Sequence, residues 1–232
     1  SGVARPSDGV HRRSALRAAY DAFGSERYVL AFDNRRVREA AAAAPYDVME
    51  IVVNGRKYGG GGIFNLYATV ASDNAFTPYV LVHEFGHHFA GLADEYYTSD
   101  VAYGSVAARN EPWELNVTAL AAFPKWKDLV TAGTPLPTPW AKEAFEAAQK
   151  EIQARRRQIR ADKRPEEEME ALFREEQGRV NALLAQGPHA AAVGAFEGAM
   201  YEAKGYFRAQ ANCIMFTRHT GFCRVCGRAL EK

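Results

Sequence analysis

Apolar side chains recur at helical spacing in two stretches near the start of the chain. Residues 14–23 carry them three or four apart and stop at Gly24, which predicts a packing helix. A second helix is expected to begin at a capping Asp33 or Asn34 and to run through the alanines to Ala44, just before a proline.

Short apolar runs without helical spacing predict strands. Residues 28–32 and 48–53 flank the alanine-rich helix, and a strand, a helix and a strand of this length predict a right-handed crossover between parallel strands. The glycine run 59–62 lacks the lysine and hydroxyl of a phosphate loop, so it predicts a loop that bends sharply or approaches another backbone closely. Residues 63–70 alternate between two faces. We expect them to form an edge strand to which an extended peptide can add by main-chain hydrogen bonds.

The second half of the chain contains a long amphipathic segment. Apolar residues recur at helical spacing, with an interruption at Pro165, which predicts a helical hairpin inserted at about residues 139–187. The basic run 155–157 is balanced by the acidic run 166–168 across the turn. An ion-paired, solvated surface is therefore favoured over a nucleic-acid site.

Composition removes several classes of partner. The chain has 232 residues, of which 47% are apolar, and its formal net charge is +1. Such a length suits one large domain or two small ones. The near-neutral charge gives no reason to expect nucleic acid or an anionic membrane as a partner. No apolar run approaches the length of a transmembrane segment.

The strongest chemical pattern is HEFGHHFAGLADEYY at residues 83–97. His83 and His87 are four apart, so on a helix they share a face and can hold one divalent ion. Glu84 lies beside them, where it can reach a water on that ion without being a ligand. This is the HExxH arrangement of zinc hydrolases, and it predicts a catalytic zinc site.

The sequence predicts where the helix that carries this pattern begins and ends. The predicted end allows a third ligand to reach the metal. The Thr77-Pro78 pair indicates the start and Gly91 the stop. The chain therefore reverses, and Asp94 can return to the metal. A catalytic zinc takes three protein ligands and keeps one position open for water, so the two histidines and Asp94 form a complete set. His88 points about 100° away from its neighbour and is expected to be a packed or surface histidine.

Three cysteines gather near the end of the chain. Cys213, Cys223 and Cys226 are expected to form one disulfide and leave one free thiol. A redox role is disfavoured, because no thioredoxin-like pattern surrounds the CxxC. A second zinc site would need a fourth ligand, and His219 is the one histidine close in sequence.

Together the motifs resemble a known family. HEFGHHFAGLADEYY, the later NCIMF at 212–216 and FCRVC at 222–226 are similar to the immunoglobulin A peptidase family of bacterial zinc metallopeptidases, in the metzincin group. VNGRKYGGGG and AMYEAKGYFR extend the resemblance over most of the chain except the hairpin.

The resemblance implies a fold and an organisation. The fold is α/β and metzincin-like: a mixed, mostly parallel sheet packed on helices, with an active-site helix. A smaller C-terminal subdomain contains a turn in which Met215 fills space beneath the metal histidines. The whole chain, 1–232, is then one catalytic domain with subdomains 1–91 and 92–232.

Two departures from the metzincin pattern concern the site. Against the common HExxHxxGxxH spacing, Gly91 comes one residue later and the third ligand position holds Asp94. Glu95 remains an alternative ligand, although we expect it to hold a histidine ring or the loop.

The second departure concerns the oxyanion donor. The tyrosine that some metzincins place two residues after the methionine is Thr217 here. Tyr201 and Tyr206 are the candidate replacements, with simple core packing as the alternative for both.

The expected function is zinc-dependent endopeptidase activity on a protein or peptide substrate, with one catalytic Zn²⁺ and Glu84 as general base. Two alternatives remain open. One is a thermolysin-like site whose third ligand is Glu111 or Glu114. The other is a non-catalytic surface adhesion module that keeps its metal for stability and binds through the hairpin. The resemblance implies a secreted, periplasmic or cell-surface location, and the oligomeric state is left open.

Overall fold

The computed structural model describes residues 2–98 and 110–232. The chain forms two compact units, Ser1–Gly91 and Leu92–Lys232. The second unit is the longer one, contrary to the smaller C-terminal part that was expected, because the helical hairpin belongs to it. No helix in the described part of the chain is both long and apolar enough to span a membrane.

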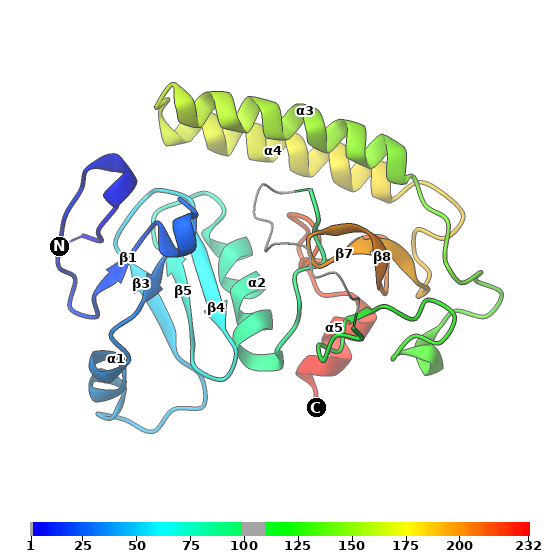
Figure 1. Ribbon diagram of the computed structural model, residues 1–232, viewed down its shortest axis with the longest axis horizontal. Helices are drawn as coiled ribbons and strands as arrows, with labels where there is room; N and C mark the ends of the chain where they lie inside the picture. Colours follow the sequence, from blue (N-terminus) through cyan, green and yellow to red (C-terminus); the bar gives the residue numbers. More distant parts are fainter. Residues whose placement is uncertain (1, 99–109) are drawn as a thin grey trace. The chain divides into compact units, whose positions relative to one another are not determined.

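The first unit contains a three-stranded sheet with the order β3-β5-β4 (Figure 1). β3 (Glu50–Val53) runs parallel to β5 (Tyr67–Ala71), whereas β4 (Gly60–Ile63) is antiparallel to β5. Among the named strands of the described residues, β3–β5 is the one parallel pair, so the expectation of a mostly parallel sheet is wrong. The tight turn at Asn65, whose φ is 58°, folds β4 directly back on β5, and so short a link permits only antiparallel pairing.

The glycine run is therefore a strand rather than a loop. It forms most of β4, and the predicted strand 63–70 is divided between the end of β4 and β5. Because β5 has a partner on each side, it is not the expected edge strand, and peptide addition to it is ruled out by this pairing. β3 and β4 are the edge strands of this sheet, and β4 has an isolated bridge from Tyr28 to Gly60 on its outer side.

No helix forms over residues 14–23, although the apolar spacing predicted one. The segment instead contains the short strand β1 (Ala18–Ala19) and the 3₁₀ turn η2 (Ala22–Gly24). Three of its non-glycine residues have positive φ, which an α-helix does not accept. They are Arg17 (58°), Asp21 (65°) and Phe23 (54°).

The predicted crossover is also wrong. β1 pairs antiparallel with β2 (Leu30–Ala31), so the apolar run 28–32 joins β1 and not β3. Between β2 and β3 the helix α1 (Asn34–Ala41) does form, and the Asp33 carboxylate caps it by accepting from the Arg36 N–H at 3.2 Å. The predicted cap is thus confirmed, while the helix ends three residues before Ala44.

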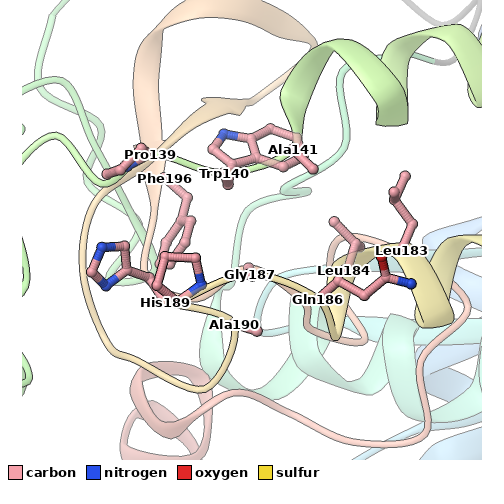
Figure 2. A pocket seen from close by; sticks show the side chains of 12 residues that line it. Pro139, Trp140, Ala141, Leu183, Leu184, Gln186, Gly187, His189, Ala190 and Phe196 are labelled. Carbon is pink, nitrogen blue, oxygen red and sulfur yellow. The ribbon is translucent and has the colours of Figure 1, made fainter.

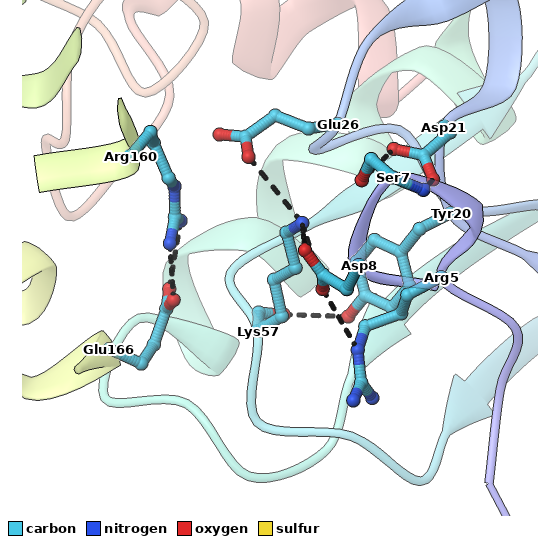
Figure 3. Close-up of polar contacts among 9 residues, drawn as sticks. All are labelled: Arg5, Ser7, Asp8, Tyr20, Asp21, Glu26, Lys57, Arg160 and Glu166. Atoms are coloured by element: carbon cyan, nitrogen blue, oxygen red, sulfur yellow. Dashed lines mark hydrogen bonds and ion pairs between the residues drawn. The ribbon is translucent and has the colours of Figure 1, made fainter. Parts of the chain in front are cut away.

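A polar network fastens the N-terminal residues, including η1 (Pro6–Asp8), to the loop before β4 (Figure 3). The Lys57 Nζ lies 3.4 Å from a carboxylate oxygen of both Asp8 and Glu26. The Tyr20 hydroxyl donates to the Lys57 carbonyl at 2.6 Å. Beneath this network lies a core of buried side chains from the N-terminal segment, α1 and the sheet, among them Val3, Tyr20, Val29, Leu30, Val37, Ile51, Val53 and Tyr67.

The second unit contains the helical hairpin that the apolar spacing predicted. α3 (Lys142–Ala161) and α4 (Glu166–Leu184) run side by side (Figure 1). The outer surface of the hairpin is ion-paired as expected. Arg155 makes a bidentate ion pair with Glu175, in which its two Nη atoms lie 2.5 and 2.8 Å from the carboxylate oxygens. The buried seam holds mainly apolar side chains, namely Phe145, Ala148, Ile152, Met169, Leu172, Phe173, Val180 and Leu184.

A small antiparallel sheet of order β6-β8-β7 accompanies the hairpin. Its strands are β6 (Val117–Thr118), β8 (Glu202–Arg208) and β7 (Phe196–Ala199), and the unit also contains η3 (Lys127–Leu129) and α5 (Arg224–Leu230).

The hairpin holds the segment 212–218, which includes the predicted methionine turn. On α4, the Gln177 amide donates to the Arg218 carbonyl, and Asn181 Oδ1 accepts from Asn212, each at 2.7 Å. Arg218 Nη1 also lies 2.5 Å from the buried Glu176 carboxylate.

Candidate metal centre

Helix α2 (Thr77–Ala90) carries the HExxH residues, and its two ends are fixed locally. At the start, Thr77 is the first helical residue rather than the cap, and its hydroxyl donates to the Ala71 carbonyl at 2.7 Å. At the other end Gly91 adopts the left-handed conformation, with φ 58° and ψ 36°, which confirms the predicted stop. The helix is therefore closed before the chain enters the second unit.

The glycines of β4 let α2 lie directly on the sheet. A Cβ atom on Gly60 would lie 2.5 Å from Val80 Cγ1, and one on Gly62 would lie 2.5 Å from the Glu84 carbonyl oxygen and 2.8 Å from His87 Cβ. All three distances are shorter than Cβ contacts in real proteins. The predicted close backbone approach is confirmed, and it sets the depth of the turn that carries Glu84 and His87.

His83 and His87 turn their rings toward each other on α2. Their Nε2 atoms lie 3.2 Å apart, and the rings meet edge to face with an interplanar angle of 84°. Two nitrogen ligands of a tetrahedral zinc, each about 2.0–2.1 Å from the metal, lie about 3.3 Å apart. Together with a carboxylate oxygen of Glu84, the nitrogens lie within 4.8 Å of one another. The geometry therefore suits one metal ion.

His88 is a packed histidine, as expected. It is 4% exposed, its Nε2 accepts from the Met49 N–H at 3.3 Å, and its Nδ1 lies 3.3 Å from the Ile63 carbonyl oxygen. A neutral ring protonated at Nδ1 satisfies both contacts. The histidine thus joins α2 to the residues beside β3 and β4 and has no ligand role.

Glu50 is a site residue that the motif did not reveal. In the sheet it lies level with Ala68, and Ala68 lies level with Gly62, so Glu50 points to the face that α2 covers. Both carboxylate oxygens are buried without a hydrogen-bond partner among the described residues. Burial, and then the nearby charge of Glu84, raise the pKa of Glu50 to about 7. The one available signal was a single acidic residue within the apolar run 48–53.

Asp94 lies in the second unit, three residues after Gly91. Its side chain is buried, and its Oδ2 accepts a hydrogen bond from the Tyr201 hydroxyl. Its main-chain oxygen accepts from the Met200 N–H at 3.0 Å. Met200 and Tyr201 form the turn between β7 and β8 with φ of 51° and 65°, an uncommon conformation for large side chains. This strained turn directs the Tyr201 hydroxyl at the predicted third ligand.

Glu95, the alternative ligand, points into the interior of the second unit. It is fully buried, and its Oε1 accepts from the Asn116 amide at 3.0 Å and lies 3.4 Å from Cys226 Sγ. Burial raises the pKa of Glu95 to about 8. Its N–H donates to the carbonyl of the fully buried Met215 at 2.8 Å, so the main chain of the predicted methionine turn holds the segment beside Asp94.

The remaining predicted residues have other surroundings. The Tyr206 hydroxyl donates to the Asn110 carbonyl at 3.3 Å. The carboxylate of Glu111, a ligand in the thermolysin-like alternative, accepts from the Thr118 hydroxyl and the Ala119 N–H, both at 2.7 Å. The expected disulfide is wrong: all three cysteines are free thiols in the structure.

One cavity of the second unit lies at the foot of the hairpin (Figure 2). Its volume is about 350 Å³, and its walls include Trp140, Leu184 and Phe196. Among its described lining residues His189 is the one titratable side chain. The lining is otherwise mainly apolar.

Comparison with known proteins points in the same direction as the geometry. The family model described as IgA Peptidase M64 matches residues 1–232, the whole chain. No curated protein matches the chain.

Proposed function

The chain belongs to the IgA peptidase M64 family of metallopeptidases, and we propose that it is a zinc endopeptidase whose metal is held by His83, His87 and Asp94. One observation carries this proposal: the two Nε2 atoms on α2 are 3.2 Å apart, with the Glu84 carboxylate in the same group. Membership of the family supplies the peptidase activity, the metal and a protein substrate; the choice of zinc and the roles of the residues are proposed here.

Two observations make Asp94 the third ligand in this proposal: its separation from His87 along the chain, and the contacts that already hold the Glu95 carboxylate. Seven residues separate His87 from Asp94, and the αL residue Gly91 turns the chain between them. Three residues after that turn, the carboxylate has roughly 10 Å of extended backbone with which to return to the helix. Glu95 is engaged by Asn116 and the cysteines, and Glu111 is held within its own loop.

Glu84 is the general base. When bound, zinc acts as a Lewis acid and lowers the pKa of water in its open position from near 16 to about 7. Glu84 takes the proton of the attacking water and returns it to the leaving amine. Tyr201 positions Asp94 through its hydroxyl, a role that the observed hydrogen bond favours over oxyanion binding.

The substrate is proposed to be an extended peptide that pairs with β4. This strand lies at the edge of its sheet and packs against α2, so a peptide added to it would run past the HExxH helix. The resemblance to exported peptidases supports a secreted, periplasmic or cell-surface location. Tyr206, whose hydroxyl is bound to a main-chain oxygen, is the weaker of the two candidate oxyanion donors.

The test compares wild type with Glu84→Gln on an unfolded protein substrate, with zinc content measured in both. Glutamine keeps the size of the side chain but cannot act as a base, so kcat is expected to fall by about 10²–10⁴-fold while zinc is retained. His87→Ala is expected to lose the zinc of the histidine site together with the activity. Undiminished cleavage by Glu84→Gln would refute the assigned base. Zinc retention without cleavage by either protein would favour the metal-stabilised binding module.

A further inference from the structure

A second group of potential metal ligands lies within the second unit. It consists of Glu95, Cys213, Cys223 and Cys226, whose oxygen and sulfur atoms all lie within 4.8 Å of one another. All four side chains are buried. They come from two distant parts of the sequence: the loop after α2, and the segment that leads into α5 together with the first turn of α5. The group shares no residue with the histidine pair.

The spacing of these atoms suits a tetrahedral zinc. Zinc–sulfur bonds of about 2.3 Å place two sulfur ligands about 3.8 Å apart, and a sulfur and an oxygen ligand about 3.6 Å apart. The Sγ atoms of Cys213 and Cys226 are 3.7 Å apart, and Cys226 Sγ lies 3.4 Å from Glu95 Oε1. A disulfide would need a separation of about 2.05 Å.

The polar surroundings fit anionic sulfur ligands. The N–H of Cys223 donates to Cys213 Sγ at 3.2 Å, and the N–H of Cys226 donates to Cys223 Sγ at 3.5 Å. Such donors stabilise thiolates, which are the form of cysteine that binds metal. The Asn116 amide fixes Glu95 Oε1 at 3.0 Å.

Glu95 also carries an unexplained atom. Its Oε2 is buried and has no hydrogen-bond partner among the described residues. A buried carboxylate is costly unless it is paired with a cation or fully hydrogen-bonded. A metal ion bound by the cysteines would interact directly with this carboxylate and compensate its charge.

A buried cation balances the remaining negative charge. Arg208 is fully buried, and its charge acts on Glu95, Cys213 and Cys223. Its two Nη groups donate to main-chain oxygens, including the Gly198 carbonyl at 2.9 Å and the Ala211 carbonyl at 3.2 Å, so the guanidinium is held in place and makes no hydrogen bond to the cysteines in the described part of the chain. Three thiolates and one carboxylate with a divalent ion and Arg208 give a net charge near −1, which an interior tolerates far better than −3.

We propose that Glu95, Cys213, Cys223 and Cys226 bind a structural Zn²⁺. Four protein ligands leave no open position, so this ion has no catalytic role. Binding displaces the thiol protons to solvent and involves no oxidation. The ion fastens the loop that contains Asp94 to the segment that contains Met215, beside the hydrogen bond between Glu95 and Met215. The proposal stands whether or not the histidine group is catalytic.

Zinc stoichiometry of the full chain, purified under reducing conditions, tests the proposal. The double variant His83→Ala/His87→Ala removes the other group and is expected to hold one zinc per chain. In that variant X-ray absorption is expected to show three sulfur ligands and one oxygen. Replacing the zinc with cobalt is expected to give a thiolate-to-cobalt charge-transfer band. A double variant without bound zinc, or wild type with an oxidised Cys213–Cys226 pair, would overturn the proposal.

Variants of Glu95 test the fourth ligand. Glu95→Cys creates a four-cysteine set and is expected to retain zinc against a chelator at least as long as wild type, whereas Glu95→Gln is expected to release it about tenfold faster or more. Glu170→Gln, which alters another buried carboxylate of the same unit, is the matched control and should keep wild-type retention. Equal retention by Glu95→Gln and wild type would remove Glu95 from the ligand set.

Discussion

The hydroxyl of Tyr201 gives the site its most specific residue-scale contact. It donates to the Asp94 carboxylate from a turn whose backbone is strained at Met200 and Tyr201. Strained conformations of large side chains persist where the surrounding structure enforces them, and they gather at functional sites. We therefore attribute the turn to the need to orient Asp94.

Tyr201→Phe should distinguish the role of the hydroxyl in orienting Asp94 from the role of the ring in packing. The ring remains, but the carboxylate loses its donor, so zinc affinity is expected to fall about 10–100-fold, as for other residues that orient a metal ligand. Competition with a zinc chelator measures the change. The matched control is Tyr206→Phe. The Tyr206 hydroxyl donates to a main-chain oxygen and not to Asp94, so this variant should keep wild-type zinc affinity. Equal affinities in the two variants would contradict the role given to Tyr201.

Glu50 predicts a pH dependence of stability in the metal-free protein. Its pKa is raised in the folded state from 4.5 to about 7, so the folded state binds the proton more tightly than the unfolded state does. The associated stability is fully present below pH 4.5 and is lost as the pH rises through about 7. The full shift corresponds to about 3 kcal/mol, which solvent screening of this partly exposed group reduces to on the order of 1 kcal/mol.

Glu50→Gln should remove this dependence. Urea unfolding of the chelated protein at pH 5 and pH 8 is expected to show a smaller loss of unfolding free energy in the variant than in wild type. All other ionisable groups are common to both proteins, so the difference between the two isolates Glu50. Identical pH profiles would show that Glu50 is not buried as described.

At the scale of elements, the glycine strand β4 is what allows α2 to lie against the sheet. Gly62→Ala would push a methyl group against the Glu84 carbonyl, which is main chain and cannot move aside cheaply. We expect a loss of about 1–3 kcal/mol in unfolding free energy, typical of overpacking, together with reduced activity. Thermal unfolding and a peptidase assay measure both effects.

Gly178→Ala is the control for this change. Gly178 lies inside α4 and has nothing within 4 Å of the position of an added Cβ. Alanine there should stabilise the protein by about 0.5–1 kcal/mol, because glycine is the poorer helix former. A Gly62→Ala protein as stable as wild type would mean that the strand and the helix are less closely packed than described.

The elements also show which predictions local sequence can support. α2, α3 and α4 were predictable because their apolar spacing, caps and breakers agree over many residues. The segment 14–23 has helical spacing, but Arg17, Asp21 and Phe23 turn the backbone out of the helical region. The glycines of β4 lack the side chains that mark a strand, since their role is to leave room for α2.

At the scale of the whole molecule, the two proposed zinc sites should differ in how they release metal. The histidine site keeps an open position and a single carboxylate ligand, whereas the cysteine site is closed by four buried protein ligands. Dialysis against a chelator is therefore expected to abolish activity while about half of the zinc and the far-ultraviolet circular dichroism remain. Added zinc should restore the activity. Activity that persists after complete zinc removal would contradict a metal-dependent mechanism.

Local sequence was enough to predict the proposed ligand pair on α2, the proposed base beside it and the ends of that helix, because these depend on residues within one or two turns of one another. It also carried the family resemblance that the match over the whole chain confirms. Tertiary structure alone decided the pairing of the strands, the burial of Glu50 beside the helix, and the meeting of Glu95 with three cysteines more than a hundred residues away. Such contacts depend on which distant surfaces become adjacent when the chain folds, and spacing along the sequence does not contain that information.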